Sequence, residues 1–260
     1  MYGFNTEQQQ QFQQDGNQLM NIYLPHRRLA FSSAVNNYTA YATGFGNGPY
    51  MYRTSDLVGN ANSSQVTISL WFKFLGGNLV NQYLLESYSG DYYRFSIMRG
   101  SDGKMYVIGY SINGNLTVNF QGSTTYFSGS GWHHILISID TSTVFNNAFI
   151  YIDDIQVSNS CNYKEQLQLT GQHSVANNVF NATQPMWGEL CEIWSKNVFY
   201  DLTVTANRRL FNDGGSPLRP VAAPSGALLY LKDPYTSFSN NSGTGGNFTT
   251  SGVLTQGTPP

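Results

Sequence analysis

The sequence VTISLWFKF at residues 66–74 has an apolar side chain at every second position. Thr67, Ser69, Trp71 and Lys73 stand between these apolar residues. Successive side chains of a β-strand point to opposite faces of its sheet, so the five apolar side chains share one face. The period of two therefore predicts a β-strand with one face in a hydrophobic core.

Similar strand patterns continue along most of the chain, with turn-forming residues between them. Asn113 and Gly114 are a strong hairpin signal because both can adopt positive φ, and Asp153 with Asp154 predicts a second tight turn. Many short strands with almost no helix predict an all-β, antiparallel sandwich or barrel. The predicted strands cover residues 83–87, 93–99, 105–111, 116–120, 131–139, 148–152, 155–157, 188–199 and 228–231.

Outside these strands we expect one short helix at residues 201–211. Asp201 or Thr203 would cap its start, and Gly214 follows its end. The tail at 237–260 is rich in Gly, Ser, Thr and Asn, so it should cross the surface with little regular structure. The Gln-rich N-terminal residues lack an apolar stripe and indicate either a docking arm or a disordered leader.

The composition excludes two classes of partner. Only 11% of the 260 residues are charged, against about 25% in an ordinary domain, and the net charge is -2. A nucleic-acid-binding protein needs a surplus of Lys and Arg, which is absent. No apolar run approaches the ~20 residues of a membrane span. The N-terminus lacks the basic start and apolar segment of a secretion signal, so secretion is not expected.

Cysteine and histidine positions argue against a metal site. Cys161 and Cys191 are too few for a disulfide scaffold, and we expect Cys191 to be a buried free thiol, with a Cys161–Cys191 bridge as the alternative. His133 and His134 are neighbours on a strand and face opposite ways, so they cannot bind one metal together. One imidazole should pack inside and the other should lie at the surface.

No catalytic set is evident. Glycosidases need two carboxylates in one cleft, and we expect Glu189 and Glu192 to point to opposite faces of their strand. Asp153 and Asp154 should also diverge. The chain is therefore not expected to be an enzyme. Trp71, Trp132 and Trp194 are expected to pack in the core or between sheets.

Three segments in order resemble the laminin G-like, concanavalin A-like jelly rolls. They are VTISLWFKF at 66–74, WHHILISID at 132–140 and AFIYIDDIQV at 148–157. The resemblance implies an antiparallel jelly-roll sandwich. With it, we expect an N-terminal arm at 1–28, a laminin G-like sandwich at 29–200 and a C-terminal extension at 201–260 that packs on the sandwich.

The C-terminal third is similar to laminin G-like proteins of tailed bacteriophages. The similarity lies in GELCEIW at 188–194, YDLTVTANRRLF at 200–211, GGSP at 214–217, LYL at 229–231 and NSGTGGNFTTSG at 241–252. It implies a virion structural protein, capsid-decorating or associated with a tail or tail fibre, assembled in the cytoplasm of a bacterial host. The implied partners are other virion proteins and copies of the chain itself, with a trimer weakly favoured. No cofactor is expected; calcium is possible in such folds, but the sequence assigns no ligands for it.

Sugar binding is the alternative function. Lectin sites combine aromatic faces with amide and carboxylate hydrogen-bonding groups. Tyr88, Asp91, Tyr92 and Tyr93 bring these groups together on one predicted loop, and Trp187 beside a glycine is a second candidate. A receptor-recognition module of a phage tail would use such a site on a host surface glycan. Glycosidase activity is the least favoured of these functions.

Overall fold

The computed structural model describes most of the chain. The two short strands β1 (Tyr23–Leu24) and β2 (Arg27–Arg28) pair with each other in a separate unit of residues 1–37. The predicted arm at 1–28 otherwise lies outside the described residues. Apart from these two strands, the structure describes residues 38–90, 93–142, 147–159, 161–179 and 183–260.

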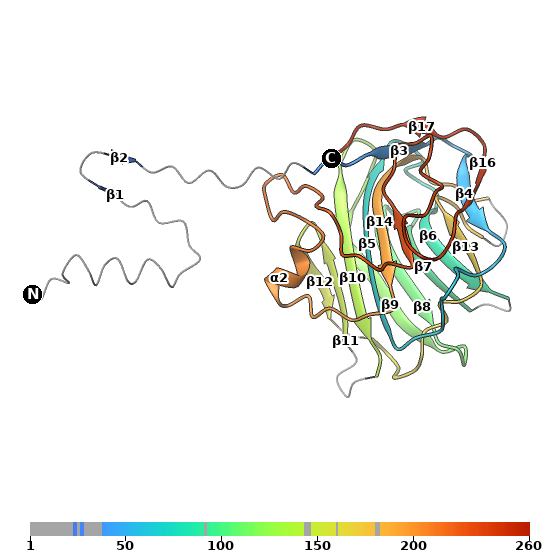
Figure 1. Ribbon diagram of the computed structural model, residues 1–260. Helices are drawn as coiled ribbons and strands as arrows, with labels where there is room; N and C mark the ends of the chain where they lie inside the picture. Colours follow the sequence, from blue (N-terminus) through green and yellow to red (C-terminus); the bar gives the residue numbers. More distant parts are fainter. Residues whose placement is uncertain are drawn as a thin grey trace, which may run out of the picture. The chain divides into compact units, whose positions relative to one another are not determined.

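Residues 38–260 form two antiparallel sheets that pack face to face (Figure 1). We call the first the β5 sheet, after its central strand, and β15 (Leu229–Leu231) adds to it beside β14. Its other strands, in spatial order, are β12 (Ile155–Asn159), β11 (Asn147–Ile152), β10 (His133–Asp140), β5 (Gln65–Phe74), β14 (Gly188–Lys196), β3 (Ala42–Phe45) and β17 (Thr255–Gln256).

The second layer, which we call the β6 sheet, has seven strands. Every pairing in it is antiparallel. The predicted all-β antiparallel sandwich is thus confirmed. The strands in spatial order are β16 (Thr249–Ser251), β4 (Tyr50–Arg53), β13 (Gln172–Val175), β6 (Gln82–Ser89), β7 (Tyr93–Arg99), β8 (Lys104–Tyr110) and β9 (Leu116–Thr125).

The main core lies between the two sheets, where the sequence places it. All five alternating apolar residues of β5 are buried there, each contributing about 1.5–3 kcal/mol relative to an exposed side chain. They meet apolar residues of the β6 sheet. The β5 residues are Val66, Ile68, Leu70, Phe72 and Phe74, and the facing residues include Phe95, Ile97, Met105 and Val107.

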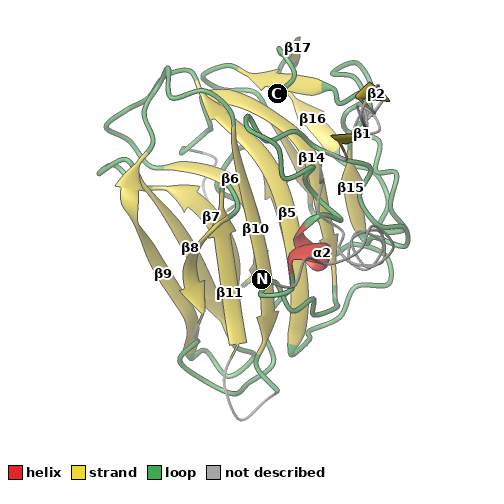
Figure 2. Cartoon of the chain, turned by 90° about the vertical axis from the view of Figure 1, so that its left-hand side faces the viewer, coloured by secondary structure: helices red, strands yellow, loops and turns green. Residues whose placement is uncertain are grey.

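The outer face of the β5 sheet is also covered. Trp194 packs with Leu202 and Phe211, which flank the helix α2 (Thr205–Arg208), and α2 lies over this face in Figure 2. Trp71 lies in a separate outer cluster with Cys191. These tryptophans are buried as predicted, but beneath surface segments rather than between the sheets. Within the described residues, no helix is long and apolar enough to cross a membrane.

The expected bounds and cap of the C-terminal helix are wrong. The helix is shorter than residues 201–211, and neither Asp201 nor Thr203 caps it: its N-cap is Val204, without a side-chain bond. The Asp201 carboxylate instead accepts hydrogen bonds from the backbone N–H and hydroxyl of Thr203, which forms a turn before the helix. The tail has little regular structure, as predicted, and its two short strands, β16 and β17, extend one sheet each.

A β-bulge in β14 reverses the prediction for its two glutamates. The register against β5 shifts between Cys191 and Trp194, and Glu192 adopts a left-handed φ of 49°. A bulge places one extra residue in the strand, so side chains three positions apart can share a face. Glu189 and Glu192 therefore both lie on the outer face, and not on opposite faces.

Candidate functional site

A groove with a volume of about 630 Å³ lies at the end of the sandwich where β5 ends and β6 begins. The β5–β6 loop forms one wall, and the segment before β14 forms another. Apolar surface comes from Leu79, Val80, Pro185 and Trp187. The polar lining residues are Asn47, Asn81, Gln82, Ser101, Thr183 and Gln184, with backbone from Gly77.

Trp187 offers the largest flat apolar surface in this groove. The residue is 42% exposed, and its indole lies directly on Gly76. The carbonyl of Trp187 accepts hydrogen bonds from the backbone N–H groups of Leu75 at 2.9 Å and Gly76 at 3.3 Å. The β5–β6 loop thus fixes both the backbone and the ring of Trp187.

The side chain of Gln82 holds the same loop in place through hydrogen bonds. It is fully buried, and its Oε1 accepts a hydrogen bond from the backbone N–H of Trp187 at 2.8 Å. Nε2 donates to the carbonyls of Gly76 at 2.7 Å and Gly77 at 2.9 Å. One amide therefore satisfies three backbone groups around the indole, so the groove is built before any ligand arrives.

A buried arginine anchors the groove from the core side. The Arg99 guanidinium donates to the carbonyl of Tyr126 at 3.2 Å and to the carbonyl of Gly77, and it stacks 4.4 Å from the ring centre of Phe74. Burial lowers the pKa of Arg99 to about 10, so it stays charged at neutral pH. Arg99 thereby holds the β5–β6 loop against the segment that follows β9.

The two predicted sugar-binding candidates, the Tyr88 loop and Trp187, lie apart in the structure. Trp187 is bonded to Gln82 at the first residue of β6, whereas Tyr88 lies near the end of that strand, roughly 20 Å away at 3.3 Å per residue. Asp91 and Tyr92 lie outside the described residues, as does the side chain of Tyr93. The loop around Tyr88 and the Trp187 groove are therefore separate candidates.

Most of the groove is not apparent from the sequence. Asn47, Asn81 and Gln184 come from three segments that only the tertiary fold brings together. The adjacent Gly76 and Gly77 were an available signal, because a Gly-Gly pair marks a turn or loop.

Ser130, His133 and Asp153 form a hydrogen-bonded chain that the sequence pattern did not predict. Nδ1 of His133 lies 2.7 Å from Oδ2 of Asp153, and Nε2 lies 3.1 Å from Oγ of Ser130. These distances match a Ser-His-Asp triad, but Ser130 does not line the groove. Asp153 also accepts the backbone N–H of His134 at 2.9 Å. The chain of hydrogen bonds joins the loop before β10 to the β11–β12 turn.

The two histidines face opposite sides of β10, as predicted, but neither lies at the surface: the His133 side chain is 15% exposed and its ring packs edge-on against Tyr126. His134 is buried and its Nε2 lies 2.8 Å from Oγ of Ser69. Burial lowers the pKa of His134 to about 4, so it is neutral. His133 is only partly buried and faces the other way. Neither residue contributes to the groove.

The carboxylates of Glu189 and Glu192, on the outer face, each interact with other side chains of the protein. Glu189 pairs with Lys73 at 3.1 Å. Glu192 accepts the hydroxyl of Tyr38 at 2.7 Å and that of Tyr230 at 2.9 Å. Neither carboxylate lines the groove, so they do not form a glycosidase pair there.

Within the residues that the structure describes, no three His, Cys, Asp or Glu side chains are grouped closely enough to bind one metal ion. Cys161 and Cys191 are both free and buried. The expectation of no cofactor, with calcium left open, stays a prediction.

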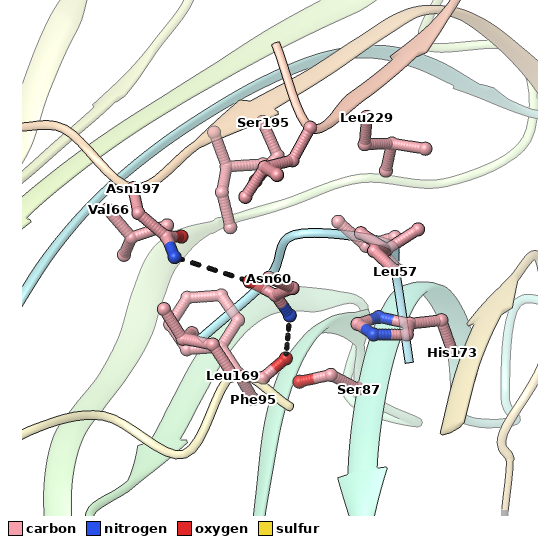
Figure 3. Close-up of a pocket in the computed structure, with 13 residues that line it drawn as sticks. Leu57, Asn60, Val66, Ser87, Phe95, Leu169, His173, Ser195, Asn197 and Leu229 are labelled. Carbon is pink, nitrogen blue, oxygen red and sulfur yellow. Dashed lines mark hydrogen bonds between the residues drawn. The ribbon is translucent and has the colours of Figure 1, made fainter. Parts of the chain in front are cut away.

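A second cavity, of about 40 Å³, lies between the sheets (Figure 3). Asn197 donates to the Oδ1 of Asn60 at 3.2 Å, and Asn60 donates to the carbonyl of Leu169 at 2.9 Å. Ser87 and His173 add further polar groups to its wall. A water molecule needs about 10–15 Å³ of such space, so this cavity has room for water and is too small for a sugar.

No protein-family model matches this chain, and no curated protein matches it in sequence. Solved structures do resemble it. A heptameric SAP-like pentraxin from Limulus polyphemus aligns with a TM-score of 0.56 and 12% identity, over 85% of this chain and 95% of the pentraxin chain. A Bacteroides ovatus protein whose name assigns it to carbohydrate binding aligns with a TM-score of 0.60 and 15% identity, over 84% of this chain and 60% of that protein.

A mouse laminin α1 fragment, domains LG4-5, aligns with a TM-score of 0.46 and 12% identity, over 81% of this chain and 52% of the fragment. At these identities the similarities to the pentraxin and the Bacteroides protein show the fold alone. They confirm the predicted jelly-roll sandwich.

Proposed function

We propose that the protein is a non-enzymatic carbohydrate-recognition module that binds glycan in the Trp187 groove. The observation that carries the proposal is the rigid, exposed indole among neutral amide and hydroxyl groups. An indole face can pack on the apolar face of a sugar ring while the amides bond its hydroxyls. The pentraxin and the Bacteroides protein add support through their shared fold.

The direct test is a glycan array followed by calorimetric titration of each hit. Trp187→Ala should weaken binding at least tenfold, about 1.4 kcal/mol, and Trp187→Phe should recover part of it. Tyr163 is a matched control, because it is 47% exposed and lies outside the groove. Tyr163→Ala should bind as the unaltered protein does. If Trp187→Ala bound glycan as tightly as the unaltered protein, the binding site would not be the Trp187 groove. An array without hits would reject glycan binding as the function.

The loop around Tyr88 is the alternative glycan site. Asp91, Tyr92 and Tyr93 complete it in sequence. If the double variant Tyr92→Ala, Tyr93→Ala loses binding while Trp187→Ala retains it, the loop and not the groove is the site. Mass spectrometry of bound glycan should find it uncleaved, because the proposed module has no hydrolytic step.

A role as a bacteriophage virion component, capsid-decorating or tail-associated, is the second proposal. The C-terminal segments that carry the phage resemblance supply α2, β15 and β16. This role and glycan binding are compatible, since a tail module could recognise a host glycan. Purified particles should contain the protein in a fixed, symmetric copy number, and its gene should lie among capsid and tail genes. Particles without it would reject this role.

A further inference from the structure

We infer that the Trp187 groove selects uncharged oligosaccharides and disfavours acidic ones, an inference that rests on the proposed function of this groove. All eleven described residues that line the groove have side chains that carry no charge at neutral pH. A carboxylate moved out of water needs a cation or several donors to offset its desolvation. This lining offers amides and hydroxyls but no cation.

The nearest buried cation cannot supply the missing contact. Arg99 has no exposed surface, and its Nη groups already donate to the carbonyls of Gly77 and Tyr126. A ligand in the groove could reach the Arg99 guanidinium only if the β5–β6 loop were displaced. Lys73 is likewise committed, to Glu189. The charge of Arg99 therefore supports the loop and does not recognise an anion.

The charged residue that follows the lining residue Ser101 in sequence has the unfavourable sign for an acidic sugar. Asp102 follows the groove residue Ser101, and its carboxylate accepts the backbone N–H of Lys104 at 3.1 Å and the hydroxyl of Tyr106 at 3.0 Å. The bond from the Lys104 backbone lowers the pKa of Asp102, so it is ionised at neutral pH. Asp102 therefore adds a negative charge next in sequence to the lining residue Ser101, which does not favour an acidic ligand.

The size and apolar content of the groove point to more than one sugar ring. Its volume of about 630 Å³ is typical of sites that enclose extended small ligands. Leu79 and Val80 are 81% and 55% exposed and continue the apolar surface beyond Trp187. A second ring, or the methyl of an acetamido group, can pack on these two side chains. Affinity should therefore rise from monosaccharide to trisaccharide.

The experiment pairs each neutral glycan with an acidic counterpart on one array. Neutral lacto-series oligosaccharides are compared with their sialylated forms, and methyl-esterified oligogalacturonides with the free acids. We expect the neutral member of each bound pair to bind about tenfold more tightly. Binding of the neutral members should change less than about twofold between low and high salt, because no charge pair is screened.

Two variants add a cation to the groove. Gln184→Lys and Asn47→Lys should narrow or reverse the preference by raising affinity for the acidic members. Asn119→Lys on the exposed face of β9 is the charge-matched control and should leave the preference unchanged. Preferential binding of acidic glycans that Trp187→Ala abolishes would overturn the inference and keep the proposed function. Binding of no glycan, neutral or acidic, would overturn both.

Discussion

The carboxylate of Asp154, in the β11–β12 turn, accepts a hydrogen bond from Nε of Arg208, the last residue of α2, at 2.7 Å. Its second oxygen accepts Nη2 of the adjacent Arg209 at 2.6 Å. The Arg208 guanidinium also lies 4.9 Å from the ring centre of Tyr151. One carboxylate therefore fastens a four-residue helix to the sheet, although the helix is too short to be stable by itself.

Replacing Asp154 by Asn should lower the free energy of unfolding by about 1–3 kcal/mol, because two charge-assisted hydrogen bonds are weakened. Asn tolerates the left-handed φ of 64° at this position, so the turn itself is kept. Urea denaturation measures the change. Asp233→Asn is the control, since Asp233 accepts only a long bond of 3.4 Å from Ser242. Equal stability of the two variants would contradict the anchoring role.

Lowering the pH should weaken the stabilising contact between Asp154 and the two arginines. Burial alone would raise the pKa of Asp154, but the bonds from Arg209 and Arg208 outweigh it and lower the pKa below 3.8. A carboxyl group with a lowered native pKa stabilises the fold above its unfolded pKa and loses that contribution as pH falls further. The difference between Asp154→Asn and the unaltered protein should therefore shrink below about pH 4.

Adding a single methyl group at Gly76 should damage the groove. A Cβ built there would lie 2.5 Å from Cδ2 of Trp187, closer than any real carbon contact. Gly76→Ala should therefore displace the indole and weaken glycan binding at least about tenfold. Calorimetric titration measures this. Gly46→Ala is the control, because a Cβ there meets nothing within 4 Å. Undiminished binding by Gly76→Ala would mean that the indole position is unimportant.

Two buried carboxyl groups should make the protein less stable as pH rises from about 4.5 to about 7. Burial raises the pKa of both Glu86 and Glu192 to about 7, from an ordinary value of 4.5. The folded state therefore binds more protons than the unfolded state in this interval, and stability falls with rising pH by roughly 2–3 kcal/mol for each group. Urea denaturation at pH 5 and pH 7.5 measures the change.

The variants Glu86→Gln and Glu192→Gln isolate this effect. His134 works in the opposite direction, since burial lowers its pKa to about 4 and its charging opposes folding in acid. His134 is unchanged in both variants, so the difference between each variant and the unaltered protein reports the glutamate alone. A variant with the same pH slope as the unaltered protein would exclude its glutamate as the cause.

The two thiols should be unreactive in the folded protein. Burial raises the pKa of Cys161 to about 11 and raises that of Cys191 as well, so little thiolate is present at neutral pH. A colorimetric thiol reagent should detect almost none before unfolding and both cysteines after unfolding without reductant. Failure to detect them in denaturant would show a disulfide in place of the free thiols.

The sandwich could be predicted because its clearest strands, among them β5 and β10, carry a period of two. β5 and β10 bury the apolar residues that the alternation assigns to the core. Asp153 and Asp154 both adopt positive φ, as their tight turn requires. These features depend on neighbours in sequence, and short-range patterns report them well.

Features that depend on distant contacts could not be predicted in this way. The bulge at Glu192 shows in sequence only as the three-residue spacing of Leu190 and Ile193, which both face the core. Trp187 could be proposed from its type and its glycine neighbour. The rest of its groove depends on the positions of loops that meet only in the folded chain.

Strand β3 holds residues from three distant parts of the chain in one sheet. Its Gly44 carbonyl accepts a bond from the hydroxyl of Thr255, 211 positions later, and Thr43 pairs with Leu190 of β14. Closing such long loops costs chain entropy before any contact is gained. Folding should therefore be slow. During synthesis β3 leaves the ribosome well before its partner strands β14 and β17, so it stays unpaired until they are made. Until then its exposed edges are available to chaperones and to neighbouring nascent chains.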